Sequence, residues 1–232
     1  MRSIVLCDNS GIELDFSPIR RLADRGGVEF EAIIYKDNSI AQRLGKGAGE
    51  GHILDRALSE SRLLANCATF WKCTGKLFVS NFTDLSASHR LDPVVFTRPG
   101  WSILKPFDRS ALGLMGAAHQ WTRSRLKRIA WRTVRGFDPE VNVNTQFWKS
   151  SVEFFDRALR HCYTTVCDRR RYFIEHAYAK AMRGMDIAAF ETMPRIVGRS
   201  GSIKCTYGGG MSAIQLDEAD RVIDECRGGP LA

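Results

Sequence analysis

The sequence predicts an α/β fold with a parallel sheet, and three features of its first 35 residues carry this prediction. Residues 3–7 form a short apolar run, typical of a buried strand, which ends at the turn-forming residues 8–11. Residues 16–25 carry apolar side chains at helical spacing and stop at two glycines. Residues 28–35 alternate and then run apolar, so they predict a second strand. The strand–helix–strand order favours a parallel pair.

The rest of the chain continues the alternation of strands and helices. A glycine-rich stretch over 45–51 is followed by apolar positions on one face of a helix over 52–64. The other expected elements are a strand over 68–79 interrupted at Thr74-Gly75, irregular chain over 90–110, a helix at least over 120–135, a strand or loop over 138–144, helices over 147–159 and 169–182, a glycine-rich loop over 195–210 and a helix over 214–226. Because no repeat and no long linker divides the chain, we expect one domain over 1–232.

Composition excludes several classes of protein. The 232 residues are 44% apolar and 26% charged, which excludes a disordered or fibrous chain. No apolar run is long enough to cross a membrane, and the first residues are too short an apolar stretch for an export signal. Seven scattered cysteines fit neither a disulfide framework nor a zinc pattern, so we expect a reduced, cytoplasmic protein without a metal site.

The net charge of +8 is concentrated in one segment. Residues 98–135 hold nine basic residues and one acid, so their net charge equals that of the whole chain. We expect this segment to be a basic, partly helical insertion in a body that is neutral overall. Within it, residues 120–135 combine six basic residues with two tryptophans, a composition typical of a helix that lies on an anionic membrane.

Two alternatives for the basic segment stay open at this stage. A pI near 9.3 is typical of nucleic-acid-binding proteins, but no nucleic-acid-binding motif accompanies the charge, so we expect no nucleic-acid partner. A solvated helix or a docking surface for another protein is the other alternative. The sequence does not indicate an oligomeric state.

The glycine segment GKGAGEG over 45–51 is a candidate anion site. It matches neither the phosphate-loop nor the dinucleotide-binding pattern, because Glu50 stands where the latter needs its third glycine. Its bare amides, followed by the start of a helix, can still approach an anion, which makes Lys46 and Gly47 candidate contacts. A flexible turn before a helix is the alternative.

The strand after it carries two lysines in an apolar run. Lys72 and Lys76 interrupt residues 70–79, and a buried strand seldom carries two lysines unless they face a polar cleft. Gly75 leaves room for a ligand at the strand end, where open α/β sheets bind ligands. We therefore expect Lys72, Lys76 and the intervening Thr74 and Gly75 to contact a pyrophosphate. An edge strand with solvated lysines is the alternative.

Taken together, five stretches resemble a family of bacterial glycosyltransferases that assemble surface polysaccharides (lipopolysaccharide, capsule or S-layer glycans). These stretches are CDNSG over 7–11, GKGAGEGHILDRAL over 45–58, KCTGKLFVSN over 72–81, DRRRYFIEHAYAKAM over 168–182 and RIVGRSGS over 195–202. The resemblance implies a single Rossmann-like domain of the GT-A type, with a mostly parallel central sheet and helices on both faces. It implies an enzyme, a hexosyl- or related transferase, that moves a sugar from a nucleotide-sugar donor to a lipid-linked or oligosaccharide acceptor.

The resemblance also implies where the donor binds. Asp8, Asn9 and Ser10 would lie near the nucleoside, although an ordinary turn explains the same residues. The strand that usually ends in an Asp-x-Asp metal site ends here in Lys72 to Lys76, with lysine where the motif usually has arginine. We therefore expect metal-independent transfer that requires no cofactor, with a divalent cation as the alternative.

The remaining candidates come from the residues and their local sequence, and for Glu175 from the resemblance as well. Glu175 stands among aromatic residues at a helix start and is the candidate base, with His176 second and Asp168 third. Charge complementarity with the helix end is the alternative for Glu175. Further candidate donor contacts are Arg171, Ser200, Gly201 and Ser202, and candidate acceptor or sugar contacts are Thr145, Gln146 and Trp148. Trp148 is alternatively a core aromatic residue. A lipid-linked acceptor would place the enzyme on the inner face of the cytoplasmic membrane. A non-catalytic nucleotide- or glycan-binding module is the alternative to an enzyme.

Overall fold

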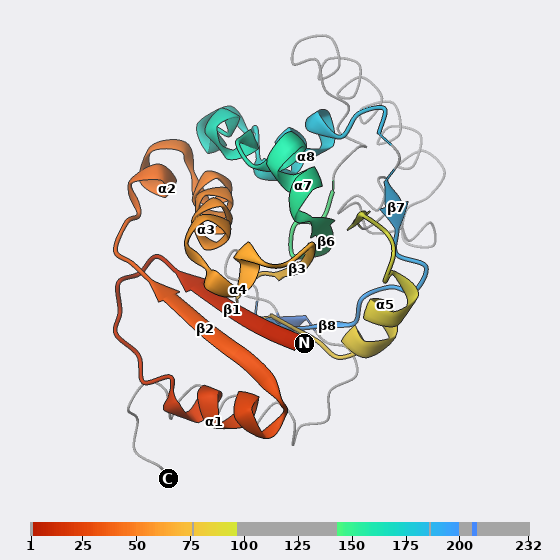
Figure 1. Cartoon of the computed structure of the whole chain (residues 1–232). Helices are drawn as coiled ribbons and strands as arrows, with labels where there is room; N and C mark the ends of the chain where they lie inside the picture. The colour runs from red at the N-terminus through yellow and green to blue at the C-terminus, as the bar shows by residue number, and fades with distance from the viewer. Residues whose placement is uncertain (1, 76, 97–142, 186, 200–205, 208–232) are drawn as a thin grey trace, which may run out of the picture.

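The computed structural model describes residues 2–75, 77–96, 143–185, 187–199 and 206–207, which form a mixed α/β structure (Figure 1). The strands are β1 Arg2–Asp8, β2 Val28–Ile34, β3 Thr69–Cys73, β4 Leu77–Val79, β5 Val94–Phe96, β6 Phe147–Ser151, β7 Ala188–Ala189, β8 Ile196–Arg199 and β9 Thr206–Tyr207. The helices are α1 Ser17–Arg25, α2 Ser39–Leu44, α3 Lys46–Glu60, α4 Arg62–Ala65, α5 Phe82–Ser88, α7 Val152–Phe154, the π-helical η1 Phe155–Leu159, the 3₁₀ turns η2 Cys162–Thr165 and η3 Asp168–Arg170, and α8 Ile174–Ala181.

The sheet topology confirms the α/β class and the first parallel pair. β1 and β2 pair in parallel from Arg2 opposite Val28 to Asp8 opposite Ile34. A second sheet has the order β3-β6-β5-β7, and a third has the order β4-β8-β9. Of the six pairings among the described strands, only β1–β2 and β5–β7 are parallel. The mostly parallel central sheet that we expected is therefore not confirmed.

The helix α3 runs antiparallel to β1 and β2 and brings its N-terminal half to their carboxyl ends. Glu31, in the middle of β2, accepts a hydrogen bond from Ser61, just after the end of α3 (2.6 Å). Tyr35, just after β2, packs its ring edge-on against His52 in the first half of α3, with ring centroids 6.3 Å apart. Helix α1 packs on β2, while α3 packs on β1 (Figure 1). The start of α3 therefore lies at the edge where parallel strands usually bind ligands.

The second sheet separates two apolar cores. Because side chains alternate along a strand, neighbouring residues contribute to opposite faces. Phe70, Phe96 and Trp148 lie in one core with residues of α8 and η1. On the other face, Phe147 stacks on Trp71 at 5.3 Å between centroids. The sheet is thus buried on both faces around its central strand β6, which explains why its sequence does not alternate between apolar and polar residues.

Three expected elements are corrected by the structure. Residues 147–159, expected to be helical, start as the strand β6 and become helical only after Ser151, because β6 pairs with both β3 and β5. The expected loop over 195–210 contains β8 and β9, which extend β4 into a sheet. The helix expected over 169–182 begins at Ile174. By contrast, the interruption of the strand at Thr74-Gly75 is confirmed, since β3 and β4 belong to different sheets.

The glycine segment is part of a helix rather than a loop before one. Lys46 to Gly51 form the first turns of α3, and the glycines let this helix pack closely against its neighbours. A Cβ atom added at Gly49 would lie 2.6 Å from the Cβ atom of Ala41 in α2, and one added at Gly47 would lie 3.2 Å from Ile174 in α8. A Cβ atom at Gly51 would overlap Tyr163 of η2. Close helix packing therefore accounts for these glycines.

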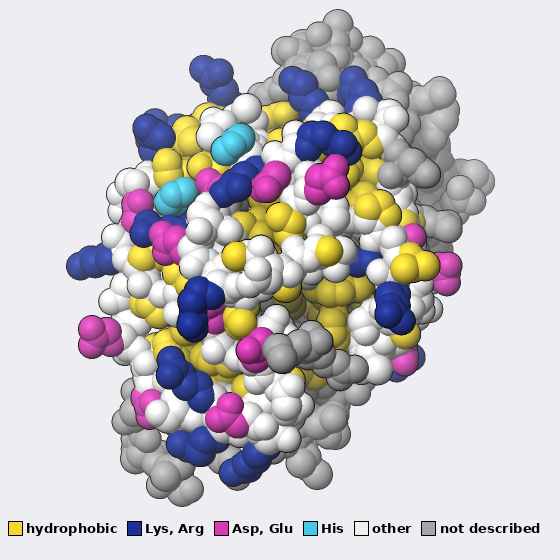
Figure 2. Space-filling view, viewed as in Figure 1, with side chains coloured by type: hydrophobic (Ala, Val, Ile, Leu, Met, Phe, Trp, Pro, Cys, Tyr) yellow, Lys and Arg dark blue, Asp and Glu magenta, His cyan; other side chains and the backbone are white. Residues whose placement is uncertain are grey.

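The basic segment over 98–135 and the expected helix over 214–226 lie outside the described residues. Among the residues that the structure describes, no helix is both long and apolar enough to cross a membrane. Figure 2 shows Lys and Arg side chains spread over the visible face, interleaved with acidic and apolar ones.

Candidate functional site

Five polar side chains converge where α3, β3, β6 and α8 meet. They are Glu50, Lys72, Thr74, Thr145 and Glu175. Four of these residues are candidates from the sequence, and they come from segments that are far apart along the chain. The structure therefore brings together the lysine expected at the end of β3, the residue expected before β6 and the expected base on α8.

Lys72 is held inside this cluster by three oxygen atoms. Its Nζ donates hydrogen bonds to the Glu50 carboxylate, to the Thr74 hydroxyl (2.6 Å) and to the main-chain carbonyl of Thr145. The Thr74 hydroxyl also donates to Glu50 Oε1 at 3.0 Å. The Lys72 side chain is only 11% exposed, so it is not the solvated lysine of an edge strand. Its charge is balanced by Glu50 within the protein.

Glu175 lies beside this ion pair, at the start of α8. Its Oε1 accepts a hydrogen bond from the Thr145 hydroxyl at 3.2 Å. Burial raises the pKa of Glu175 above its usual range, and the negative charge of Glu50 acts in the same direction. The Thr145 hydrogen bond and the positive charge of Lys72 oppose this rise. A carboxyl group with a raised pKa in a polar cluster is the kind of group that acts as a general base.

A small cavity of about 10 Å³ adjoins the cluster. Its lining includes Glu50, Lys72 and Thr145 on one side and Trp148 and Tyr178 on the other. This volume is about that of one water molecule. The Trp148 Nε1 atom is buried and has no hydrogen-bond partner among the described residues. The lining of the cavity thus combines polar and charged residues with aromatic ones.

The N-terminus of α3 is occupied by a carboxylate of the chain itself. Asp168 accepts a hydrogen bond from the main-chain N–H of Lys46 at 2.9 Å. Gly45, with φ of 115°, makes room for this carboxylate, because a Cβ atom there would overlap the Asp168 side chain. Asp168 therefore fills the place that the sequence assigned to a phosphate. Asp168, the third candidate for the base, is therefore bound to the start of α3 and does not belong to the cluster that contains Glu175.

The residues after β1 form the turn that the sequence left as an alternative. Asp8 accepts a hydrogen bond from the main-chain N–H of Ser10 at 3.2 Å, which is an Asx turn. Asn9 donates to the main-chain carbonyl of Asp37 at 3.0 Å and so ties the ends of β1 and β2 together. Asp8 and Asn9 are partly buried and Ser10 is exposed. All three lie at the carboxyl edge toward which the start of α3 points.

Two candidates have structural roles instead of the expected ones. Trp148 is fully buried and stacks on Phe96 with centroids 4.9 Å apart, so it cannot stack on a sugar, and the core interpretation is the right one. His176 is buried, and its Nδ1 accepts a hydrogen bond from the main-chain N–H of Phe173 at 3.0 Å. This bond caps the start of α8, so the Nδ1 atom already has a hydrogen-bond donor and is not available to accept a proton from a substrate.

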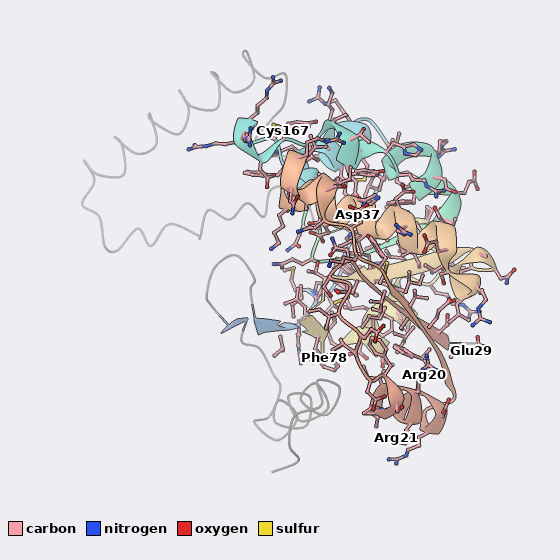
Figure 3. All side chains as sticks on the ribbon, turned by 90° about the vertical axis from the view of Figure 1, so that its left-hand side faces the viewer. Arg20, Arg21, Glu29, Asp37, Phe78 and Cys167 are labelled. Atoms are coloured by element: carbon pink, nitrogen blue, oxygen red, sulfur yellow. The ribbon has the colours of Figure 1, made fainter. Side chains whose placement is uncertain are left out.

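The other candidates lie around the rim of the site or outside the described residues. Gln146 accepts a hydrogen bond at its main-chain carbonyl from Thr74, which joins the two strand ends. Arg171 is exposed at the turn before α8, and Gly75 has open space where its side chain would be. Lys76 and Ser200, Gly201 and Ser202 lie outside the described residues. In Figure 3, Cys167, next to Asp168, lies at the opposite end of the molecule from Arg20 and Arg21 of α1, so α1 is remote from the site.

Glu50 is the residue of this cluster that sequence reasoning missed. We considered it only as a departure from a glycine pattern. A signal was present, however, because Glu50 lies one helical turn before Leu54 and two before Ala57, on the buried face of α3. An acid on an apolar helix face needs a buried partner, and Lys72 is a lysine in an apolar strand.

Within the described ranges, no three His, Cys, Asp or Glu side chains group closely enough to hold a metal ion. Comparisons of the chain with protein-family models, curated proteins and solved structures found no significant match.

Proposed function

We propose that the chain is a glycosyltransferase that moves a sugar from a nucleotide-sugar donor to a lipid-linked or oligosaccharide acceptor, without a metal ion. One observation carries this proposal: Glu175, Lys72, Thr74 and Thr145, chosen separately from the sequence, meet in one hydrogen-bonded cluster. Lys72, Thr74 and Glu175 lie in the stretches that resemble glycosyltransferases of surface-polysaccharide assembly.

Glu175 acts as the general base in this proposal. In an inverting transfer, the acceptor hydroxyl oxygen attacks the anomeric carbon while the bond from that carbon to the donor phosphate breaks. The hydroxyl proton passes to the Glu175 carboxylate, and the nucleotide leaves with its phosphates. The raised pKa of Glu175 brings its proton affinity closer to neutral pH, which is where a base transfers protons most effectively. Thr145 fixes the orientation of the carboxylate.

In this proposal the donor lies along the carboxyl edge of β1 and β2, and exposed basic side chains hold its phosphates, because Asp168 already binds the main-chain N–H of Lys46 at the start of α3. Lys46 and Arg171 are exposed at this end of the structure and are the candidates for contact with the phosphates. Lys72 contributes positive charge from inside the cluster and does not bind the phosphates directly, because its ammonium group is already paired with Glu50. Positive side chains at this place supply the charge that a divalent cation provides in other transferases.

The acceptor in this proposal is anchored in a membrane by its lipid. The basic segment over 120–135, outside the described residues, would hold the enzyme at the inner face of the cytoplasmic membrane. Flotation with anionic vesicles at low salt tests this part separately. Failure to bind the vesicles would remove the membrane contact and leave the transfer proposal in place.

A non-catalytic nucleotide- or glycan-binding module is a second candidate, and one observation favours it. The Lys72 ammonium group already binds three oxygen atoms of the chain, and the adjoining cavity has room for about one water molecule. A cluster in which Lys72 is already paired with Glu50 would explain binding at the rim without turnover at the cluster.

A thermal-shift screen against nucleotides and nucleotide sugars, with and without Mg²⁺ or Mn²⁺, identifies the donor first. A ligand that binds the folded state raises the unfolding temperature. Donor hydrolysis and transfer are then measured for the wild type, for Glu175→Gln, and for Glu153→Gln as a control at a side chain that is 88% exposed. We expect turnover by the wild type and the control and a large loss in Glu175→Gln. Binding without turnover of any donor would favour the module, and full turnover by Glu175→Gln would remove Glu175 as the base.

A further inference from the structure

The charged environment of Glu175 is built by two residues from different elements. Glu50 approaches from α3 and Lys72 from β3, and they are the charged groups that act on the Glu175 carboxyl. Thr145, before β6, supplies the hydrogen bond, and Tyr178 lies on α8 itself with its ring in the wall of the same cavity. Two acids and one lysine therefore belong to one cluster, with a net charge of −1 when both acids are ionised.

The position of Glu50 is fixed more firmly than that of a typical helix side chain. It stands between Gly49 and Gly51, the two glycines at which α3 approaches α2 and η2 most closely. Because neither glycine leaves room for even a methyl group, α3 cannot rotate or slide without moving its neighbours. The glycine segment thus holds the Glu50 carboxylate on Lys72.

Lys72 is placed by Glu50 in turn. Its ammonium group has two neutral oxygen partners, the Thr74 hydroxyl and the Thr145 carbonyl, and one charged partner, Glu50. A charged acceptor makes a stronger hydrogen bond than a neutral one, so Glu50 is the partner that determines where the ammonium group lies. The same ammonium group binds the main chain of Thr145, whose hydroxyl contacts Glu175.

We propose that Glu50 is a positioning residue for Glu175: it holds Lys72 against Thr145, whose hydroxyl binds the Glu175 carboxylate. The inference rests on the proposed function only for the role of Glu175 as a base. Removing Glu50 leaves Glu175 beside an unbalanced lysine, which favours the ionised carboxylate. Removing Lys72 leaves it beside an unbalanced acid, which favours the protonated form.

The test is a direct titration of Glu175 that does not depend on activity. The carboxyl carbon of Glu175 is followed by NMR in protein labelled with ¹³C-glutamate, and its signal is assigned by its loss in Glu175→Gln. We expect the titration midpoint to fall by about one pH unit in Glu50→Gln and to rise in Lys72→Met. The double variant Glu50→Gln/Lys72→Met, which removes both charges, should lie between the two. Glu153→Gln, remote and exposed, should leave the midpoint unchanged.

Opposite shifts are the signature of the proposal, because an opened and hydrated site would move the midpoint in the same direction in both single variants. Shifts of the same sign, or no shift in Glu50→Gln, would overturn the inference. If Lys72→Met does not fold, the comparison of Glu50→Gln with the double variant carries the same test. Opposite shifts in a protein that turns over no donor would uphold the inference while the proposed function fails. In an active protein, the acid limb of the pH profile of kcat/KM should shift with the midpoint.

Discussion

Replacing Gly49 with alanine should destabilise the protein although alanine is the better helix former. The gain in helix propensity is about 0.8–1.0 kcal/mol in a helix interior. The new Cβ atom would lie 2.6 Å from the Cβ atom of Ala41, and ordinary contact begins at 3.4 Å, so α2 would have to move by about 0.8 Å. Overpacking of this kind costs about 1–3 kcal/mol. Because the contact atom is fixed to the main chain of α2, the upper half of that range applies, and the net destabilisation is about 1–2 kcal/mol.

Urea unfolding followed by circular dichroism measures this change directly. For a chain of this length, about 1–2 kcal/mol lowers the melting temperature by about 2–8 °C. Gly75→Ala is the matched control, because Gly75 is exposed and has no atom within 4 Å of the added methyl group. The control should melt with the wild type. If Gly49→Ala is as stable as the wild type or more so, α3 does not pack on α2 as closely as described, and the explanation for the glycine segment is wrong.

Two further substitutions test the packing around the site. Glu31 accepts hydrogen bonds from the Ser61 hydroxyl and from the main-chain amides of Leu63 and Arg62, and the Ser61 bond is the main cause of its lowered pKa. A group whose pKa is lowered on folding stabilises the folded state above its ordinary pKa of 4.5, and this stability is lost as pH falls through the folded-state pKa. Glu31→Gln should therefore lose less stability than the wild type on acidification below about pH 4.5. Equal acid sensitivity of the two proteins in urea unfolding would refute this. Lys149 is 2% exposed and donates hydrogen bonds to the main-chain carbonyls of His89, Arg90 and Asp92. Lys149→Met should therefore lower the free energy of unfolding by about 2–3 kcal/mol and speed amide hydrogen exchange just after α5. An unchanged midpoint of urea unfolding would contradict this role of Lys149.

The parts of the fold that depend on local sequence could be predicted. The strand–helix–strand unit over 2–34 follows from short apolar runs, helical spacing and a glycine stop, all of which act between neighbouring residues. The strand β6 could not be predicted in this way. Its residues FWKSS lie in the middle of a sheet, with Phe147 in one core and Trp148 in the other, so they show no alternation between apolar and polar residues.

The candidate site shows the same division between local and long-range information. Lys72 and Glu175 were identifiable because a lysine in an apolar strand and an acid among aromatic residues are unusual. Their contacts were not, because Glu50 is 22 residues from Lys72 and Thr145 is 30 residues from Glu175, and only the folded chain brings them together. Glu50 was therefore missed, and Thr145 was expected to contact a sugar and not Glu175. The same long-range packing places Asp168 at the start of α3, where the sequence favoured a phosphate.

The pH dependence of transfer in the wild type and in Glu175→Gln tests the central claim most directly. A base must be ionised to accept a proton, so kcat/KM of the wild type should rise with pH through a midpoint above 4.5, the ordinary value for a glutamate. In Glu175→Gln this limb should be absent and the rate should fall by about 10²–10⁴-fold. A Glu175→Gln variant that transfers sugar at the wild-type rate, with the same acid limb, would contradict the account.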